Sequence, residues 1–299
     1  MPQGITSKLR HEDILTYEEF FRLVEIAVEE GVTKIRLTGG EPTVRRNFVD
    51  FVSQLNTIPG LSNLCLTTNG VLLPDMAEPL AAAGIKWINI SLDSLKPQKF
   101  ERITGFDKFH QVWQGIETAL SLGFEAVKIN VVAIQGENDQ EFIDFARLTL
   151  ERPLDVRFIE YMPMGAVGYW SEERFISSGQ IKELLTPLGP LTPVPSTDKD
   201  GPVKKYRLPD SRGTVGFISA LSDHFCATCN RIRLTADGKL RLCLHSNQEL
   251  DLKTSLRQGA TRQELTDILR QAVLNKPARH LLNEKIHPSS NRSMNLIGG

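Results

Sequence analysis

Three of the four cysteines in this 299-residue chain lie close together in the sequence. Cys226 and Cys229 are separated by two residues, and Cys243 follows after thirteen more. The segment 230–242 predicts a short hairpin that turns at Asp237-Gly238 and returns Cys243 toward the pair. Three thiolates at such a corner can hold a zinc ion or an iron–sulfur cluster. In a cluster of four irons, one iron would have no cysteine ligand and could bind a substrate.

Two histidines, His224 and His245, flank these cysteines, so a Cys3His zinc site is the alternative to an iron–sulfur cluster. The residues alone favour neither metal. The fourth cysteine, Cys65, lies in an apolar segment and is interpreted as a core thiol. His280 and His287 have no matching partner and are interpreted as structural. Clustered cysteines favour metal ligation in a reducing compartment over a disulfide framework.

Alternating strand-like and helix-like segments precede the cysteines and would position a ligand. Residues 17–30 have helical spacing behind Thr16 and Glu19, a capping-box pattern. Strands are predicted at 34–38, 63–68, 86–92, 125–134 and 154–161, and further helices at 46–57, 75–83, 109–122 and 139–150. The strands read as continuous apolar runs, which is typical of a parallel sheet covered by helices. The order of elements therefore predicts an α/β fold with a parallel sheet or barrel.

The second part of the chain has a different composition. Residues 187–202 contain five prolines and predict a linker. Strand-like segments at 203–208 and 214–219, the cysteine hairpin, and helices near 248–257 and 262–275 follow it. We therefore expect a first domain over 1–186, a linker over 187–202 and a smaller α+β domain over 203–299.

Several residues suited to ligand binding follow successive strands. In a parallel α/β fold, ligands bind at the carboxyl ends of the strands. The segments at these ends are Gly39-Gly40-Glu41-Pro42, Thr67-Thr68-Asn69-Gly70, Ser91-Leu92-Asp93 and Met162-Pro163. A plain turn explains any one of them, but their recurrence favours a ligand site. The paired glycines would let a backbone approach a ligand closely, and Glu41 offers a carboxylate to an ammonium group.

Cationic side chains accompany these segments. Arg36 alternates with two apolar residues inside a strand, so it needs an anionic partner. Lys128 and Asn130 share one face of the fourth strand. Arg231 and Arg233 fall on one side of the segment after the cysteine pair, and two guanidinium forks there suit a polyphosphate or a purine nucleotide. The alternatives are a structural ion pair for Arg36 and a solvated hairpin face for the two arginines.

The overall composition is that of an ordinary globular protein. The chain is 40% apolar and 24% charged, with a net charge of −1 and a pI near 6.6. The opening residues show no signal-peptide pattern, and no apolar stretch approaches the ~18 residues that a membrane span needs. We therefore expect a cytoplasmic protein without a membrane partner. The near-neutral charge gives no support for nucleic acid as a partner.

A series of motifs resembles a known family. The motifs are TKIRLTGGEPTVRRNF, LTTNG, ISLDS, VKINVV, FIEYMPMG, FCATCNRIRLTADGKLRLCL and the Gly-Gly ending. In the same order, they resemble the GTP 3′,8-cyclases of molybdenum cofactor biosynthesis, which are radical S-adenosylmethionine lyases. The resemblance covers nearly the whole chain and favours iron–sulfur over zinc. It implies an incomplete (βα)6 barrel with one [4Fe–4S] cluster and S-adenosylmethionine, and a C-terminal α+β domain with a second [4Fe–4S] cluster.

The resemblance also implies roles for individual residues. The ligands of the C-terminal cluster would be Cys226, Cys229 and Cys243. The GTP contacts would be Arg36, Thr67, Lys128, Arg231, Ile232 and Arg233. The S-adenosylmethionine contacts would be Gly40, Glu41, Ser91 and Met162, with Glu41 at the methionine amino group. Gly298 and Gly299 would form a tail that reaches into the active site and supports activity.

The family reaction implied by this resemblance is a radical cyclisation. Reductive cleavage of S-adenosylmethionine gives a deoxyadenosyl radical, which removes the ribose 3′ hydrogen of GTP, and the carbon radical attacks C8 of guanine. The product is (8S)-3′,8-cyclo-7,8-dihydroguanosine 5′-triphosphate. An electron donor and the next enzyme, cyclic pyranopterin monophosphate synthase, are the implied partners, and a homodimer is compatible with the resemblance.

One feature departs from the family pattern. The family holds its first cluster with a CxxxCxxC motif after the first barrel strand, and this chain contains no such motif. Its opening Met-Pro-Gln-Gly-Ile resembles the residues that follow that motif. We therefore expect the first strand, three ligands and an upstream arginine to be missing, which would leave an open strand edge beside 34–38.

We expect the chain as written to bind GTP without cyclising it. Three interpretations follow: a truncated cyclase, a non-catalytic GTP-binding iron–sulfur protein that has lost radical initiation, and a zinc-stabilised nucleotide-binding protein.

Overall fold

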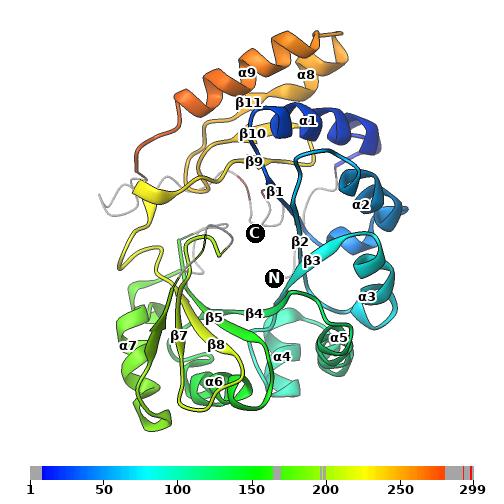
Figure 1. The fold of residues 1–299 in the computed structure, drawn as a ribbon. Helices are drawn as coiled ribbons and strands as arrows, with labels where there is room; N and C mark the ends of the chain where they lie inside the picture. Colours follow the sequence, from blue (N-terminus) through cyan, green and yellow to red (C-terminus); the bar gives the residue numbers. More distant parts are fainter. Residues whose placement is uncertain are drawn as a thin grey trace.

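A curved eight-stranded sheet forms the larger part of the molecule (Figure 1). The computed structural model describes residues 9–163, 170–195, 197, 200–279, 292 and 297. The strands are β1 (Lys34–Leu37), β2 (Asn63–Thr68), β3 (Ile85–Ser91), β4 (Ala126–Ala133), β5 (Asp155–Glu160), β6 (Thr192–Val194), β7 (Lys204–Arg207) and β8 (Thr214–Ile218). Their order is β1-β2-β3-β4-β5-β8-β7-β6, with parallel pairing from β1 to β8 and antiparallel pairing beyond. This arrangement confirms the predicted α/β partial barrel.

Helices cover the outer face of this sheet (Figure 1). They are α1 (Tyr17–Glu29), α2 (Phe48–Asn56), α3 (Leu73–Ala82), α4 (Pro97–Thr104), α5 (Phe109–Ser121), α6 (Phe142–Glu151) and α7 (Ser178–Leu184). The predicted capping box is present at α1: Thr16 Oγ1 accepts from the Glu19 N–H at 3.2 Å, and the Glu19 carboxylate accepts from the Thr16 N–H at 2.8 Å. The sequence analysis did not predict α4 or α7.

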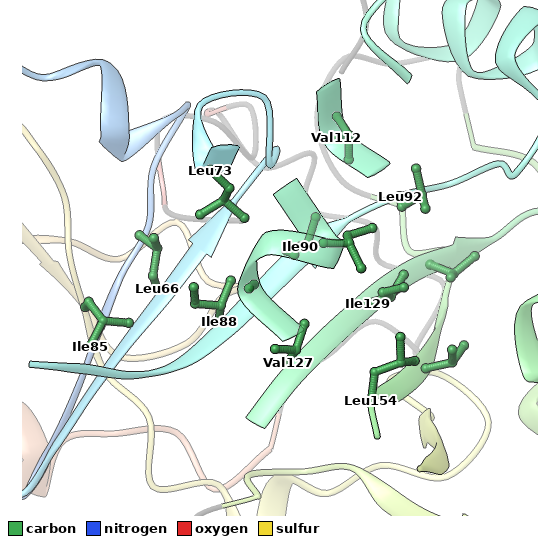
Figure 2. Packing of buried hydrophobic residues seen from close by; sticks show 14 of the residues in the cluster. Leu66, Leu73, Ile85, Ile88, Ile90, Leu92, Val112, Val127, Ile129 and Leu154 are labelled. Atoms are coloured by element: carbon green, nitrogen blue, oxygen red, sulfur yellow. The ribbon is translucent and has the colours of Figure 1, made fainter. Parts of the chain in front are cut away.

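The two faces of the barrel strands differ in polarity. Leu66, Ile88 and Ile129 point toward the helices and pack there with Leu73 of α3 and Val112 of α5 (Figure 2). Because side chains alternate along a strand, the residues between them face the barrel interior, and many of these are polar. The prediction of continuous apolar strands was therefore wrong. Helices cover one face only, and the other face lines the interior of an open barrel.

The region predicted as a linker carries ordered structure. Residues 187–202 include strand β6, and β7 and β8 continue the barrel sheet, where β8 pairs with β5 in parallel register. A glycine is required at this junction, since a Cβ on Gly213 would lie 2.0 Å from the Leu154 carbonyl oxygen. The three-part division stays a prediction, and the pairing of β8 favours a boundary after residue 218.

A second, smaller sheet follows the barrel. Its strands are β9 (Arg233–Leu234), β10 (Lys239–Arg241) and β11 (Leu250–Asp251), and helices α8 (Leu252–Arg257) and α9 (Arg262–Leu274) accompany them. Leu240, Leu265 and Leu269 from this part pack with Leu23 and Ile26 of α1. Helix α1 therefore contributes to both cores and joins the barrel to the α+β part.

Strand β1 lies at the end of the sheet and pairs with β2 alone within the described ranges. The predicted absence of a strand on its other side stays a prediction. None of the helices that the structure describes is long and apolar enough to cross a membrane. The cytoplasmic location stays a prediction.

Candidate active site

The inner face of the barrel is cationic. Alternation along β1 to β5 places these residues on it: Lys34, Arg36, Cys65, Thr67, Trp87, Asn89, Lys128, Asn130, Asp155 and Arg157. Four of these side chains are cationic and one is acidic. Asp200 is a second nearby carboxylate, but it is already paired with Lys205 at 2.9 Å. The interior therefore carries more positive charge than the described acidic groups compensate.

Lys128 is a buried member of this cationic group and lies on β4, between β3 and β5. It is only 4% exposed, and its Nζ lies 4.5 Å from the centroid of the Trp87 ring. Lys34 Nζ lies 4.5 Å from the same ring, so two ammonium groups share one aromatic side chain. Burial, together with the charge of Arg157, lowers the pKa of Lys128 to about 7. An anion bound here would restore the charged form.

Arg157 is a buried guanidinium with incomplete pairing. It is 3% exposed, and its closest carboxylate contact is 3.7 Å, from Nη2 to Asp155 Oδ2. Nε and Nη2 have no hydrogen-bond partner in the described part of the chain. Burial lowers the pKa of Arg157 to about 10, against the opposing charge of Asp155. A buried donor without a partner is costly, so this group is suited to an anionic ligand.

The sequence analysis missed Lys34 and Arg157. Both occupy the same alternating pattern that singled out Arg36: Lys-Ile-Arg-Leu in β1 and Asp-Val-Arg-Phe in β5. In each strand the apolar residues face the helices and the basic residues face the interior. A period-two reading of all five strands would have found them.

Two arginines of the C-terminal part come near Arg36. Burial lowers the pKa of Arg233 to about 10, and the charges of Arg231 and Arg36 act in the same direction. Arg36 keeps much of its surface open to solvent, yet the surrounding protein and Arg231 lower its pKa too. The positive charges of Arg36, Arg231 and Arg233 therefore act on one another, and they form one cationic group between β1 and the segment after Cys229.

The cysteine hairpin contains two members of this cationic group. Cys226 begins a 3-10 turn, Cys226–Thr228, Cys229 follows it, and Cys243 follows β10. The charges of Cys229 and Cys243 act to raise the pKa of Arg233, against the effect of its burial. No group of three or more His, Cys, Asp and Glu side chains among the described residues is arranged to hold a metal ion.

Basic groups surround the Cys229 thiol. Lys276 Nζ donates to the carbonyl oxygens of Cys229 and Arg231 at 2.6 and 2.9 Å, and lies 3.6 Å from Cys229 Sγ. Burial acts to raise the pKa of this thiol, but hydrogen bonding and charge from Arg231, with the charge of Lys276, outweigh it and hold the pKa below its ordinary value. A thiolate favoured in this way suits a cluster ligand. The chemistry of the Cys229 thiol is therefore that of a cluster ligand, and Cys226 and Cys243 are half-buried thiols of the same hairpin.

One cysteine of the sequence lies outside the hairpin. Cys65 is the remaining cysteine, and it is fully buried in β2. It lies on the inner face, opposite Arg36 of β1 and Trp87 of β3, and not among the helix-facing apolar residues. Burial raises the pKa of its thiol. A single buried thiol does not fit the family's first cluster.

The ends of the first two strands are joined through Glu41. Its Oε1 accepts from the N–H and Oγ1 of Thr43 at 3.1 and 2.7 Å and from Thr68 Oγ1 at 2.9 Å. Its Oε2 accepts from the Asn69 N–H at 2.6 Å and so retains acceptor capacity. A Cβ added to Gly39 or Gly40 would meet nothing within 4 Å. The backbone before Glu41 therefore borders open space that a ligand could enter.

Three other predicted contacts, Thr67, Ser91 and Met162, lie in the last residues of their strands or just after them, at the carboxyl ends of β2, β3 and β5. Ser91 ends β3 and is exposed, and Met162 follows β5 and is half-buried. Thr67 Oγ1 accepts from Asn89 Nδ2 at 3.4 Å. Ile232 packs against the second core. Gly298 and Gly299 lie outside the described residues, as do His280 and His287.

Comparison with known proteins identifies relatives for both parts. Residues 3–149 match the family described as Radical SAM superfamily, and residues 154–282 match Molybdenum Cofactor Synthesis C. The chain is 48% identical over its full length to the GTP 3′,8-cyclase of Desulforamulus reducens and covers 91% of that protein. It is 45% identical to the GTP 3′,8-cyclase of Alkaliphilus metalliredigens, with 92% of that protein covered.

A solved structure shares the fold. It is described as the crystal structure of Streptococcus suis SuiB bound to S-adenosylmethionine, with a TM-score of 0.62 at 16% identity. The alignment covers 88% of this chain and 62% of that one. At this identity the likeness concerns the fold alone.

Proposed function

Because this chain belongs to the GTP 3′,8-cyclase family of radical S-adenosylmethionine enzymes, we propose that its cationic barrel interior binds the triphosphate of GTP. Arg157 carries this proposal, since it is a buried guanidinium whose Nε and Nη2 have no hydrogen-bond partner among the described residues. Lys34, Arg36 and Lys128 share the same face. A triphosphate supplies the negative charge and the acceptor oxygens that this face requires.

The cationic groups would orient the nucleotide as well as bind it. A triphosphate held by β1, β4 and β5 leaves the nucleoside to extend toward Arg231 and Arg233, which form one cationic group with Arg36. Fixing both ends of GTP limits the geometries available to the ribose and the base. Charge compensation in this partly buried interior also costs little reorganisation during the reaction.

The strand ends would hold S-adenosylmethionine. Gly40 offers backbone beside open space, and the Oε2 atom of Glu41 keeps acceptor capacity for an ammonium group. Ser91 and Met162 would contact the remainder of the molecule. Thr68 and Asn69 donate hydrogen bonds to Glu41 and so fix its carboxylate. Glu41 would therefore orient the ammonium group of the ligand as well as balance its charge.

The hairpin would hold one [4Fe–4S] cluster through Cys226, Cys229 and Cys243. When bound, this cluster supplies an iron without a cysteine ligand, on which the guanine base can bind. Arg231 and Lys276 favour the thiolate form of Cys229. The hydrogen bonds from Lys276 to the carbonyl oxygens of Cys229 and Arg231 also hold residues 229–231 in place. The residues present do not fit the cluster that cleaves S-adenosylmethionine in this family, because the one cysteine outside the hairpin, Cys65, is fully buried.

GTP binding should take up protons near pH 7. The pKa of Lys128 is about 7 in the folded chain, below its ordinary value, and a bound triphosphate should raise it again. Affinity should therefore fall as the pH rises above 7, by at most about tenfold per pH unit for one proton. Calorimetry in buffers of different ionisation enthalpy measures both quantities.

Lys128→Met is the matched variant, because protonation of the free GTP phosphates is the same in both experiments. The difference between the two proteins therefore reports the proton on Lys128. The variant should bind GTP more weakly, and its binding should lack the Lys128 proton. GMP should bind the unmodified chain more weakly than GTP does, because it presents fewer charges. A chain that binds no GTP, or binds GMP and GTP equally, would show that the interior is not a triphosphate site.

A further inference from the structure

Trp87 contacts two lysine side chains on the inner face of the barrel. The Lys34 and Lys128 Nζ atoms each lie 4.5 Å from the centroid of its ring. An ammonium group is attracted to the face of an indole within about 6 Å of the centroid. The two nitrogens are at most about 9 Å apart, which is twice the distance of each from the centroid. Trp87 therefore brings a cation of β1 close to a cation of β4, although β2 and β3 separate these strands.

The position of the indole ring is set by its surroundings in the sheet. Trp87 is paired with Cys65 of β2 and with Ala126 of β4, and these short side chains leave room for the ring. Trp87 is only 6% exposed, and its Nε1 donates to Glu125 Oε2 at 3.1 Å. Because Glu125 directly precedes β4, this hydrogen bond fixes the ring against the start of that strand. The fold therefore orients the ring independently of the two lysines.

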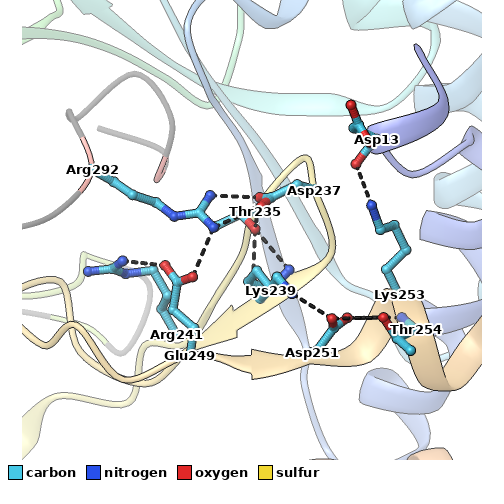
Figure 3. A network of polar contacts seen from close by, with 10 residues as sticks. All are labelled: Asp13, Thr235, Asp237, Lys239, Arg241, Glu249, Asp251, Lys253, Thr254 and Arg292. Atoms are coloured by element: carbon cyan, nitrogen blue, oxygen red, sulfur yellow. Dashed lines mark hydrogen bonds and ion pairs between the residues drawn. The ribbon is translucent and has the colours of Figure 1, made fainter. Parts of the chain in front are cut away.

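An aromatic partner differs from a carboxylate in its effect on a lysine. In the C-terminal part, Lys239 Nζ donates to Asp251 Oδ2 at 2.5 Å, and Figure 3 shows its side chain directed at that carboxylate. Within the described part of the chain, the Asp155 carboxylate acts on Lys128 through its charge and not through a hydrogen bond. An aromatic face attracts an ammonium group but carries no net charge. Trp87 therefore places Lys128 without neutralising it, and the charge stays available to an anionic ligand.

We propose that Trp87 is a positioning residue of the triphosphate site, where it holds the Lys34 and Lys128 ammonium groups in place without neutralising them. The inference rests on the proposed function, in which both groups bind the phosphates of GTP. Two like charges at this separation repel each other, and the negative face of the ring offsets part of the repulsion. Side chains that are already in place lose less conformational entropy when a ligand binds. The ring therefore prepares both lysines for the triphosphate.

GTP affinity, measured by calorimetry, tests this role. Trp87→Leu should weaken GTP binding by about tenfold, because both cation–π contacts are lost. Trp87→Phe should recover part of the affinity, since phenylalanine keeps an aromatic face. The effect of Trp87→Leu should be smaller in a Lys128→Met background, because residues that act through one another are not additive. A purely structural role would give the same loss in both backgrounds.

The emission of Trp87 gives a second readout that leaves the ring in place. The chain has three tryptophans, so in the variant Trp113→Phe, Trp170→Phe all tryptophan emission comes from Trp87. Without nucleotide, Lys34→Met and Lys128→Met should each shift this emission, because a charge beside the indole is removed. With both lysines present, GTP should shift it as well.

Trp113→Leu is the matched control for affinity. Trp113 lies on α5 and contacts the Arg152 guanidinium, whose Cζ is 5.4 Å from the ring centroid, on the helix-covered side of the sheet. This variant should bind GTP as the unmodified chain does. Unchanged GTP affinity in Trp87→Leu overturns the positioning role, and so does emission that neither lysine variant shifts. If the lysine variants shift the emission but the unmodified chain binds no GTP, the proposed function fails and the placement of the two lysines by Trp87 stands.

Discussion

Replacing Arg157 with methionine should weaken GTP binding about 100-fold. The Nε and Nη2 atoms of Arg157 have no hydrogen-bond partner in the described residues, and each charged hydrogen bond to a phosphate contributes about 1.5–3 kcal/mol. Methionine keeps an apolar stem of similar length but carries no donor. Isothermal calorimetry with GTP measures the loss directly.

The same substitution should not destabilise the protein. A buried guanidinium with a 3.7 Å carboxylate contact costs more in desolvation than it gains, so its removal should leave the free energy of unfolding unchanged or raise it by up to about 2 kcal/mol. Denaturant unfolding in the absence of nucleotide gives this quantity.

Arg147→Met is the control for both measurements. Arg147 lies on the exposed surface and pairs with Asp144 at 3.0 Å, so both affinity and stability should change little. A large loss of stability in Arg157→Met, or equal GTP affinity in the two variants, would contradict a ligand-binding role for Arg157.

The chain on its own should form no cyclised GTP. It has four cysteines, of which Cys226, Cys229 and Cys243 can serve one cluster, while Cys65 is fully buried in β2. No set of its cysteines remains for the cluster that cleaves S-adenosylmethionine in this family. Incubation with GTP, S-adenosylmethionine and a strong reductant, followed by mass spectrometry, should detect neither cyclised GTP nor 5′-deoxyadenosine.

A catalytically competent GTP 3′,8-cyclase treated in parallel is the control for the assay conditions. Binding of GTP by this chain under the same conditions should persist, because the barrel cations do not depend on that cluster. Measurable turnover from the pure chain would contradict the assignment of all its cysteines.

Local signals in the sequence predicted most elements closely. Thr16 and Glu19 located the start of α1, and the apolar segments located β1 to β5 to within about two residues. Helix α4 was missed because Pro97 suggests a break, although proline is well suited to the first turn of a helix. The pairing of strands that lie far apart in the sequence was harder to predict. Nothing within 203–219 indicates that β8 pairs with β5 and not with the cysteine hairpin.

The site was predicted in part, for a related reason. Arg36 and Lys128 were singled out within their strands, whereas Lys34 and Arg157 were missed although they follow the same period-two pattern. The Leu15 N–H, just before α1, donates to the Ala236 carbonyl oxygen of the hairpin turn at 2.8 Å, although the two residues are more than 200 positions apart. Such contacts depend on how the two parts pack, in particular through α1, which contributes to both cores.

The central claim is that the hairpin holds one iron–sulfur cluster beside a nucleotide site. Iron, acid-labile sulfide and zinc per chain, measured after anaerobic reconstitution, test it most directly. We expect about four irons with matching sulfide, and loss of both in Cys229→Ser but not in Cys65→Ala. Zinc without sulfide would instead make the hairpin a structural zinc site, and the assignment of Cys226, Cys229 and Cys243 to a substrate-binding cluster would be wrong.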